Sequence, residues 1–386
     1  MERGFYTIMA SQFFSSLADN ALVVIAIALL IDLHARAYLT PRLKFVFVLF
    51  YVILAPFVGA FADSMPKGRV MFISNTIKIT GCGLLFFAMH QYHALAAYAV
   101  VGLGAAAYSP AKYGILTELL PPEKLVIANG WIEGLTVASI VLGTVLGGVL
   151  ITPAVANVLM GFDFPFIDTG IDSALEVSIL LVAIIYAIAA LFNLYIPNTG
   201  VDHRIPKKNP FYLIHEFRHC VKLLWTDKLG QISLAVTTLF WGAGATLPFI
   251  VLKWAEVAMN YPLNQAAQLQ GVVAVGIAIG AIMAARWVSL RQSVKVIPLG
   301  IAMGIVVMAM ILVKDLWIAI ALLMLIGGLA GFFVVPMNAL LQHRGHILMG
   351  AGHSIAVQNF NGNLSILLML SLYAALILLD VHIYVV

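Results

Sequence analysis

The chain alternates between long apolar runs and short polar segments, and this alternation predicts helices that cross a lipid bilayer. Eleven runs have roughly the 20 residues that a helix needs to span about 30 Å of hydrocarbon. They lie near 5–33, 44–62, 70–89, 94–119, 125–151, 174–197, 231–256, 265–288, 293–313, 316–342 and 350–379. We therefore expect an all-α polytopic membrane protein.

One polar pattern occurs twice, at 104–134 and again at 331–363, where a short polar hairpin joins two apolar runs. Pro110 corresponds to Pro336, an offset of 226 residues. A repeat of about half the chain predicts two equivalent helical bundles, as in many secondary transporters. Two six-helix bundles need twelve helices, so we expect that the twelfth is absent from this chain, through truncation or loss.

Composition and charge agree with a membrane protein. Hydrophobic residues make up 62% of the chain, charged residues 10%, and the mean hydropathy is +1.03. A soluble domain of this composition would lack polar surface. If the runs alternate across the bilayer, fifteen of the 21 Lys and Arg fall on the side of the amino terminus, five on the other side and Lys78 inside a run. This bias predicts a cytoplasmic amino terminus.

A polar linker divides the chain into the expected domains. We predict an N-terminal bundle at 1–197, a cytoplasmic linker at 198–230 and a C-terminal bundle at 231–386. Apolar residues recur at helical spacing from Phe211 to Trp225 with basic residues between them, which predicts an amphipathic surface helix. This helix either contacts anionic lipids or a partner, or is only a linker whose charges satisfy the positive-inside rule.

Three charged residues lie inside apolar runs, where an ionisable group is costly and usually faces a cavity or a partner. Asp19 lies in the middle of the first run and Asn20 follows it. Lys78 lies in the third run and Glu133 early in the fifth. We predict that these residues contribute to a substrate site. The structural alternatives are that Lys78 snorkels to the surface and that Glu133 caps or pairs at a helix end.

The eleventh run adds a stripe of neutral amides: Gln358, Asn359, Asn361 and Asn363. Amides donate and accept hydrogen bonds, which suits a zwitterionic or glycerol-type head group better than a bare ion. The alternative is interhelical hydrogen bonding in lipid. We predict that Gln358, Asn359 and Asn361 line the cavity.

The segment GAFADSMPKGRV after the second run carries Asp63, Lys67 and Arg69. It resembles the signature of the second loop of the major facilitator superfamily, with the Gly-Arg pair displaced by about two residues. An acid at this position suits the positive end of a helix and would close a cytoplasmic gate. The sequence therefore predicts a gate formed by these three residues.

A closer resemblance extends over nearly the whole chain. The motifs are ADNALV at 18–23, LAPFVGAFADSMPKGRVM at 54–71, GLGAAAYSPAKYGILTELLPPEKLVIANGWIEG at 102–134, LFWGAGATL at 239–247, GLAGFFVVPMNALLQ at 328–342 and GAGHSIAVQN at 350–359. They resemble the bacterial lysophospholipid transporter family.

The resemblance implies a major facilitator fold that moves lysophospholipids, notably lysophosphatidylethanolamine, from the outer to the inner leaflet of the bacterial inner membrane. A cytoplasmic acyl-acyl-carrier-protein synthetase/acyltransferase would then re-acylate them. The same resemblance places Asp19 and Asn20 in the central cavity and Glu133 near its inner side.

Two other classes stay open. A major facilitator symporter or antiporter for another small amphipathic solute, with Asp19 as the cation site, would share the fold. A membrane enzyme would need a nucleophile or acid–base set, and we find no His followed five residues later by Asp, no phosphate-binding loop and no metal-spaced His cluster. We predict a monomeric transporter and not an enzyme, with no cofactor, metal or nucleic-acid partner.

Overall fold

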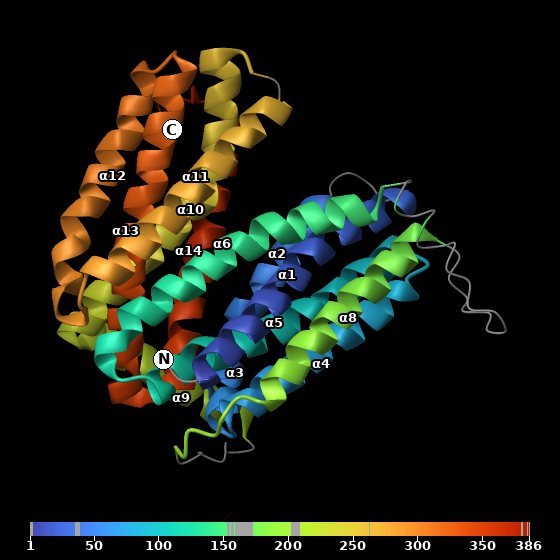
Figure 1. Ribbon diagram of the computed structural model, residues 1–386, viewed down its shortest axis with the longest axis vertical. Helices are drawn as coiled ribbons and strands as arrows, with labels where there is room; N and C mark the ends of the chain where they lie inside the picture. The colour runs from blue at the N-terminus through green and yellow to red at the C-terminus, as the bar shows by residue number, and fades with distance from the viewer. Residues whose placement is uncertain are drawn as a thin grey trace. The chain divides into compact units, whose positions relative to one another are not determined.

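Figure 1 shows the computed structural model, which describes residues 3–34, 39–152, 155, 158, 173–201, 209–261, 263–379, 381–383 and 385. Every regular element within these residues is a helix. The chain forms two compact units. The first unit comprises Met1–Ile115 and Ala138–Ile214, and the second unit comprises Leu116–Val137 and His215–Val386.

The helices of the first unit are α1 (Arg3–Asp32), α2 (Leu39–Ile53), α3 (Ala55–Asp63), α4 (Lys67–Phe86) and α8 (Ala174–Leu194). Two further helices, α5 (Gln91–Leu119) and α6 (Leu125–Leu150), contribute residues to both units. The helix α9 (Pro210–Thr226) begins in the first unit and continues into the second from His215. The second unit also contains α10 (Lys228–Met259), α11 (Leu263–Trp287), α12 (Ile297–Ala309), α13 (Leu316–Met349) and α14 (Ala351–Leu378). Short 3₁₀ turns lie at Pro122–Lys124, Leu290–Val296 and Met310–Leu312.

Each of the eleven predicted runs coincides with helix in the described part of the chain. Among the described residues, nine helices are long and apolar enough to cross a membrane, and the pair α2–α3, bent by 63°, makes up to ten. The one remaining run, the third, corresponds to α4, which has 20 residues but also carries Lys67, Arg69 and Lys78 and is therefore less apolar. The protein is thus an all-α, multi-pass membrane protein.

The amphipathic helix predicted in the linker is α9, which buries Phe217, Cys220 and Leu224 on one face. The ring of Phe217 packs edge-on against Phe360 of α14, with centroids 5.5 Å apart. Residues 202–208 of the predicted linker lie outside the described residues.

In the first unit, α8 packs against both α1 and α4, as Figure 1 also shows. The apolar core lies between these helices and α5, and includes Leu22, Ile25, Leu85 and Val182. The helix α6 approaches α1 closely because Gly143 and Gly147 have no side chains. A Cβ at Gly143 would lie 2.8 Å from the Asn20 Cβ, so α1 is held in place along the stretch that carries Asp19.

In the second unit, α11 and α13 cross in backbone contact. A Cβ on Gly280 would overlap the Gly328 carbonyl oxygen, and a Cβ on Gly331 would overlap the Ile277 carbonyl oxygen. Small residues permit this approach, which increases van der Waals contact where lipid offers no hydrophobic driving force. The crossing fixes the register of the two helices.

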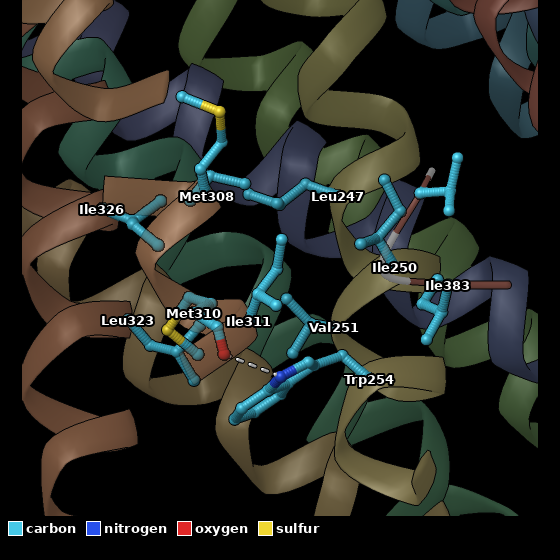
Figure 2. A pocket seen from close by; sticks show the side chains of 12 residues that line it. Leu247, Ile250, Val251, Trp254, Met308, Met310, Ile311, Leu323, Ile326 and Ile383 are labelled. Atoms are coloured by element: carbon cyan, nitrogen blue, oxygen red, sulfur yellow. Dashed lines mark hydrogen bonds between the residues drawn. The ribbon is translucent and has the colours of Figure 1, made fainter. Parts of the chain in front are cut away.

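The second unit also encloses an apolar cavity of about 330 Å³ between α10, α12 and α13 (Figure 2). Its lining residues are Leu247, Ile250, Val251, Trp254, Val307, Met308, Met310, Ile311, Leu323, Ile326, Ile383 and Val385. The indole N–H of Trp254 donates to the Met310 carbonyl oxygen at 3.0 Å. The cavity therefore presents hydrocarbon and no side-chain charge.

Candidate functional site

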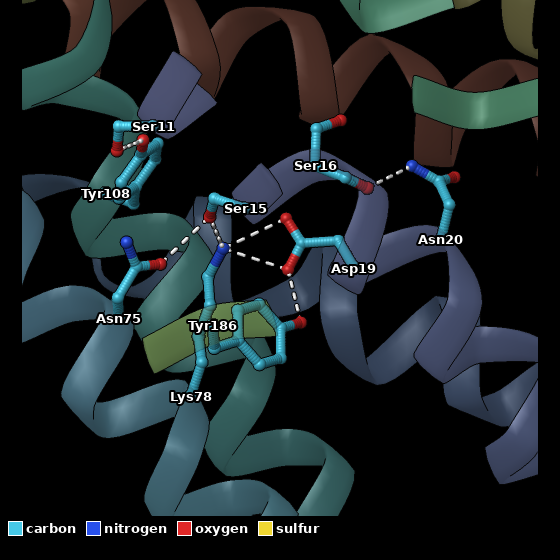
Figure 3. Close-up of polar contacts among 9 residues, drawn as sticks. All are labelled: Ser11, Ser15, Ser16, Asp19, Asn20, Asn75, Lys78, Tyr108 and Tyr186. Carbon is cyan, nitrogen blue, oxygen red and sulfur yellow. Dashed lines mark hydrogen bonds and ion pairs between the residues drawn. The ribbon is translucent and has the colours of Figure 1, made fainter. Parts of the chain in front are cut away.

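The centre of the candidate site is an ion pair between helices α1 and α4. Lys78 of α4 contacts both carboxylate oxygens of Asp19 of α1, with Nζ 2.9 Å from each (Figure 3). The Lys78 side chain is 1% exposed, whereas that of Asp19 is 25% exposed. The prediction from the sequence that both residues belong to one site is consistent with this pairing, and Lys78 does not snorkel to the surface.

Two more side chains bond directly to the pair, and a third bonds to one of these two. The Tyr186 hydroxyl of α8 donates to Asp19 Oδ1 at 2.7 Å. Lys78 Nζ also donates to Ser15 Oγ at 3.1 Å, and Ser15 in turn donates to Asn75 Oδ1 at 2.9 Å. The Nδ2 of the fully buried Asn75 has no acceptor among the described residues. The cluster thus holds one carboxylate, one ammonium and an uncommitted amide donor.

The cluster extends towards the end of α8 through aromatic and polar contacts. Lys78 Nζ lies 4.9 Å from the ring centroid of Tyr108 and 5.3 Å from that of Tyr186. Tyr108 and Ser11 share a hydrogen bond of 3.2 Å, and Ser11 also donates to the side-chain oxygen of Asn193. Ring faces attract cations, so the tyrosines stabilise the buried ammonium group.

A glycine makes room for Lys78. A Cβ on Gly104 of α5 would lie 2.7 Å from Lys78 Cγ and 2.8 Å from the Ser74 carbonyl oxygen. Asn20, by contrast, turns its Nδ2 to the Ser16 carbonyl oxygen of its own helix at 2.8 Å. The structure therefore brings Lys78 to Asp19 and leaves Asn20 outside this hydrogen-bond network.

A second polar cluster lies in the second unit, around Glu133 of α6. Asn338 of α13 donates to Glu133 Oε1 at 3.4 Å, and Gln358 of α14 donates to Asn338 Oδ1 at 2.9 Å. Asn129 and Gln342 exchange two amide hydrogen bonds of 2.9 Å. Along α6 and α13 the pairs Asn129–Gln342 and Glu133–Asn338 run in opposite order, as in antiparallel helices. Through Asn338 the cluster also connects two of the predicted residues, Glu133 and Gln358.

The remaining predicted amides are oriented differently. Asn361 donates to the Val357 carbonyl oxygen and Asn363 to the Asn359 carbonyl oxygen, each at 2.8 Å within α14. Asn359 is half-buried on the same helix. Local bonds of this kind satisfy an amide without a partner helix.

The predicted gate residues lie at the α3–α4 junction of the first unit. Lys67 Nζ is 2.7 Å from Asp63 Oδ1 and 2.6 Å from the Ala62 carbonyl oxygen. The Lys67 side chain is almost completely buried, whereas Arg69 is exposed. The structure thus brings Asp63 and Lys67 together and leaves Arg69 outside their hydrogen bonds.

Sequence analysis missed Tyr186, Tyr108 and Asn338. The tyrosines lie in apolar helices and give no signal, because an aromatic residue there is usually core. Asn338 and Gln342 could have been found, because they repeat in the second half the four-residue spacing of Asn129 and Glu133. Within the described residues, no group of three His, Cys, Asp or Glu is placed to hold a metal ion.

Comparison with solved structures defines the class. The human organic anion transporter MFSD10 superposes with a TM-score of 0.73 at 14% identity, covering 97% of this chain and 94% of that one. The transporter FucP in its outward conformation has a TM-score of 0.70 at 14% identity, covering 96% of this chain and 92% of FucP. At this identity the likeness shows the fold alone, which is that of the major facilitator transporters.

Comparison of sequences narrows the class to a family. A family model of the Major Facilitator Superfamily matches residues 8–370. The lysophospholipid transporter LplT of Yersinia enterocolitica is 40% identical over 382 residues, covering 99% of this chain and 89% of the relative. The same transporter of Serratia proteamaculans is 42% identical over 375 residues, covering 97% and 88%. The chain therefore belongs to the lysophospholipid transporter family of the Major Facilitator Superfamily.

Proposed function

We propose that this protein carries lysophospholipids, lysophosphatidylethanolamine among them, from the outer to the inner leaflet of a bacterial inner membrane. The amino terminus is cytoplasmic, and the protein works as a monomer by alternating access. A cytoplasmic acyl-acyl-carrier-protein synthetase/acyltransferase re-acylates the delivered lipid. The observation that carries this proposal is the buried Asp19–Lys78 ion pair between α1 and α4, in a chain whose relatives are named lysophospholipid transporters.

The ion pair matches the charges of the head group of lysophosphatidylethanolamine, which carries an ammonium and a phosphate. The ammonium binds Asp19, which is the more exposed partner, and the phosphate binds Lys78. Breaking a buried pair by removing one partner costs about 3–5 kcal/mol, because it leaves an unpaired charge. A zwitterion avoids this cost, because it supplies a new partner to each residue at once. Asn75 Nδ2 offers a further donor to a phosphate oxygen.

The other predicted residues have supporting roles in this proposal. Asn20 adds a polar surface beside Asp19, while Glu133 and Gln358, linked through Asn338, form a second polar surface for the head group. Asn359 and Asn361 add further amides for the head group from the same helix as Gln358. The acyl chain stays in apolar surroundings while the head group crosses.

Asp63, Lys67 and Arg69 form the cytoplasmic gate in this proposal. The support is the buried Lys67–Asp63 pair, which fixes the turn between α3 and α4. Arg69 lies exposed two residues further along α4, where it is accessible to a partner that changes between states.

The test is transfer of labelled lysophosphatidylethanolamine in proteoliposomes by the wild type, Asp19→Asn and Lys78→Gln. We expect the wild type to transfer the lipid and each single variant to lose most of the activity, since each leaves a charge without its partner. Asn20→Ala is the matched control, because Asn20 is adjacent in sequence but outside the hydrogen-bond network of the pair. Each variant is first checked for expression and for a monodisperse purified state.

The outcomes separate the competing interpretations. A wild type that transfers no lysophospholipid but transports another small amphipathic solute would support a symporter or antiporter and refute the lipid proposal. If the wild type transfers the lipid and Asp19→Asn is equally active, lysophospholipid remains the substrate and Asp19 has a structural role.

A further inference from the structure

The linker helix α9 is attached to the second unit by one of its faces. Phe217, Cys220 and Leu224 are buried on that face. Next to Phe217, a carboxylate oxygen of Glu216 lies 4.0 Å from Nε2 of His353, at the start of α14. These contacts fix the rotation of α9 about its own axis, and they leave the opposite face uncovered.

The contacts with α14 place α9 at the level of the lipid head groups. With 28 residues, α14 is about 42 Å long, the thickness of a bilayer with its head groups. His353 is its third residue and Phe360, which packs against Phe217, is its tenth. They lie about 3 and 14 Å from its start, which covers the head-group layer and the upper part of the acyl chains. The spanning helix α10 begins only two residues after α9 ends.

The uncovered face of α9 carries aromatic and basic side chains. Phe211, His215, Arg218 and Lys222 follow one another at intervals of three or four residues, which places them on one face of a helix. Lys222 comes five residues after the buried Phe217, about 140° around the helix. Phe211 is 81% exposed, and the other three are also exposed. These four residues form the outer stripe of α9.

The outer stripe is positively charged. Arg218 and Lys222 are one turn apart, with about 5–6 Å between Cβ atoms at this spacing. Neither forms a hydrogen bond or an ion pair with any residue in the described ranges. The acids nearest to them have other partners: Glu216 faces His353, and Asp227 accepts hydrogen bonds from the start of α10 and from α13. The two cations are therefore not neutralised by the acids of the helix or of its end.

We propose that the outer stripe binds anionic phospholipids of the membrane surface, at a site separate from that of the transported lipid. Arg218 and Lys222 contact phosphate oxygens, and the guanidinium group does so through its planar fork. Phe211 inserts its ring below the head groups. Interfacial helices combine basic residues, which are attracted to anionic lipids, with aromatic residues, which enter the boundary between head groups and acyl chains.

An acidic protein is the other partner that a basic stripe could bind. The depth of α9 favours lipid, because a protein approaching from water would have to displace head groups from along the helix. An exposed phenylalanine beside two cations is also better matched by a lipid, which offers a phosphate and hydrocarbon within a few ångströms of each other.

The experiment uses the full chain with His215→Cys, labelled with the small fluorophore bimane, in vesicles of phosphatidylcholine and phosphatidylglycerol. His215 belongs to the outer stripe, whereas the native Cys82 and Cys220 are buried. One of the two lipids carries a nitroxide near the glycerol, which quenches the fluorophore on contact. The ratio of quenching by the two labelled lipids, at equal mole fraction, measures the preference of the stripe for the anionic lipid.

We expect phosphatidylglycerol to be preferred by about tenfold or more, because each basic residue near an anionic surface contributes about fivefold. The double variant Arg218→Gln/Lys222→Gln should lower the preference towards one, whereas Arg218→Lys, which retains the charge, should keep most of it. Salt at about 1 M should also reduce the preference of the wild type, since the Debye length is then about 3 Å.

Arg291→Gln/Lys295→Gln is the matched control. It also removes two exposed basic residues that are four positions apart in the second unit, but from the turn before α12. The preference for phosphatidylglycerol at the bimane on α9 should stay at the value of the protein without these two substitutions.

Three results would overturn the inference. Equal quenching by the two lipids would mean that the stripe does not select anionic lipid. Quenching by neither lipid would mean that the stripe faces water, and an acidic protein would then be its partner. A preference that survives in Arg218→Gln/Lys222→Gln would mean that other groups bind the lipid. None of these measurements uses transport, so the site is tested independently of the proposed function.

Discussion

At the scale of the residue, the energetics of the candidate site depend on the burial of Lys78. Its side chain is 1% exposed, and its ammonium group contacts Asp19, Ser15 and two aromatic rings in place of water. A charge at this depth in a membrane protein is stabilised only by such partners. The position of the Lys78 chain therefore decides whether the ion pair forms.

Gly104→Ala tests this positioning. The new methyl group would lie 2.7 Å from Lys78 Cγ and 2.8 Å from the Ser74 carbonyl oxygen, so α4 or the lysine chain must move. We expect a loss of about 1–3 kcal/mol of stability, as for other overpacked sites, and a reduced rate of lysophospholipid transfer. The measurements are the unfolding temperature of the purified protein and the transfer assay.

Gly83→Ala is the control for this substitution. It lies on α4 five residues beyond Lys78, and its new methyl group would meet nothing within 4 Å. At an exposed helical position alanine is more stable than glycine by roughly 0.5–1 kcal/mol. The free energy of unfolding should therefore stay the same or rise slightly. If Gly104→Ala were as stable and active as Gly83→Ala, close packing against Lys78 would not matter to the site.

At the scale of the element, the start of α10 is fixed by Asp227. Its carboxylate caps the helix by accepting from the Gly230 N–H at 2.8 Å, and it also accepts from two nitrogens of Arg344 on α13, with Nε at 3.0 Å. The hydrogen bonds from Arg344 are the largest cause of the lowered pKa of Asp227, and the Gly230 N–H adds to the effect. One acid thus joins the ends of two spanning helices.

The lowered pKa predicts the pH dependence of this link. A group whose pKa is lower in the folded state stabilises the fold above its unfolded pKa, about 3.9 for an aspartate, and loses that contribution as the pH falls through the folded value. Arg344→Gln should cost about 2 kcal/mol at pH 7, the typical worth of a hydrogen bond to a charged group. The difference in unfolding temperature from the wild type should shrink below about pH 4.

Lys253→Gln is the control for the Asp227–Arg344 pair. Lys253 pairs with Glu256 at 3.0 Å, but both side chains are strongly exposed, and such surface pairs contribute about 0–1 kcal/mol. The measurement is thermal unfolding of the wild type and the two variants from pH 7 to below about pH 4. A difference between Arg344→Gln and the wild type that stays constant over this range and below it would contradict a stabilising role for the Asp227 carboxylate.

At the scale of the whole molecule, the distribution of basic residues predicts the orientation in the membrane. With a cytoplasmic amino terminus, Lys295 before α12 lies on the inner side and Lys314 after α12 lies on the outer side. Both side chains are exposed, and the two native cysteines, Cys82 and Cys220, are buried. Introduced cysteines at these lysines therefore report the topology with little background.

An impermeant maleimide should label Lys314→Cys in intact spheroplasts and should label Lys295→Cys only after lysis. The physical reason is the excess of Lys and Arg in cytoplasmic loops. Labelling of Lys295→Cys from outside, with Lys314→Cys protected, would reverse the proposed topology and with it the direction of lipid transfer.

The helices of this protein could be predicted from the sequence because each depends on local properties. Span length, apolar composition and helical spacing predicted the eleven runs and the surface helix, and every one coincides with helix in the described residues. The bend of 63° between α2 and α3 was not predicted, although Pro56 in the first turn of α3 marks it. The motifs predicted the family, which the comparisons confirm.

The amino-acid sequence thus determined that the chain crosses a membrane, where its helices lie and which polar residues they carry, because these properties follow from composition and spacing within about 20 residues. Only the tertiary structure decided which of those residues meet. Asp19 pairs with a lysine 59 positions away and with Tyr186, whose helix gives no polar signal, whereas Asn361 bonds within its own turn. Partner choice depends on how helices pack and rotate, and glycines such as Gly104 set that packing without being recognisable in the hydrophobic pattern.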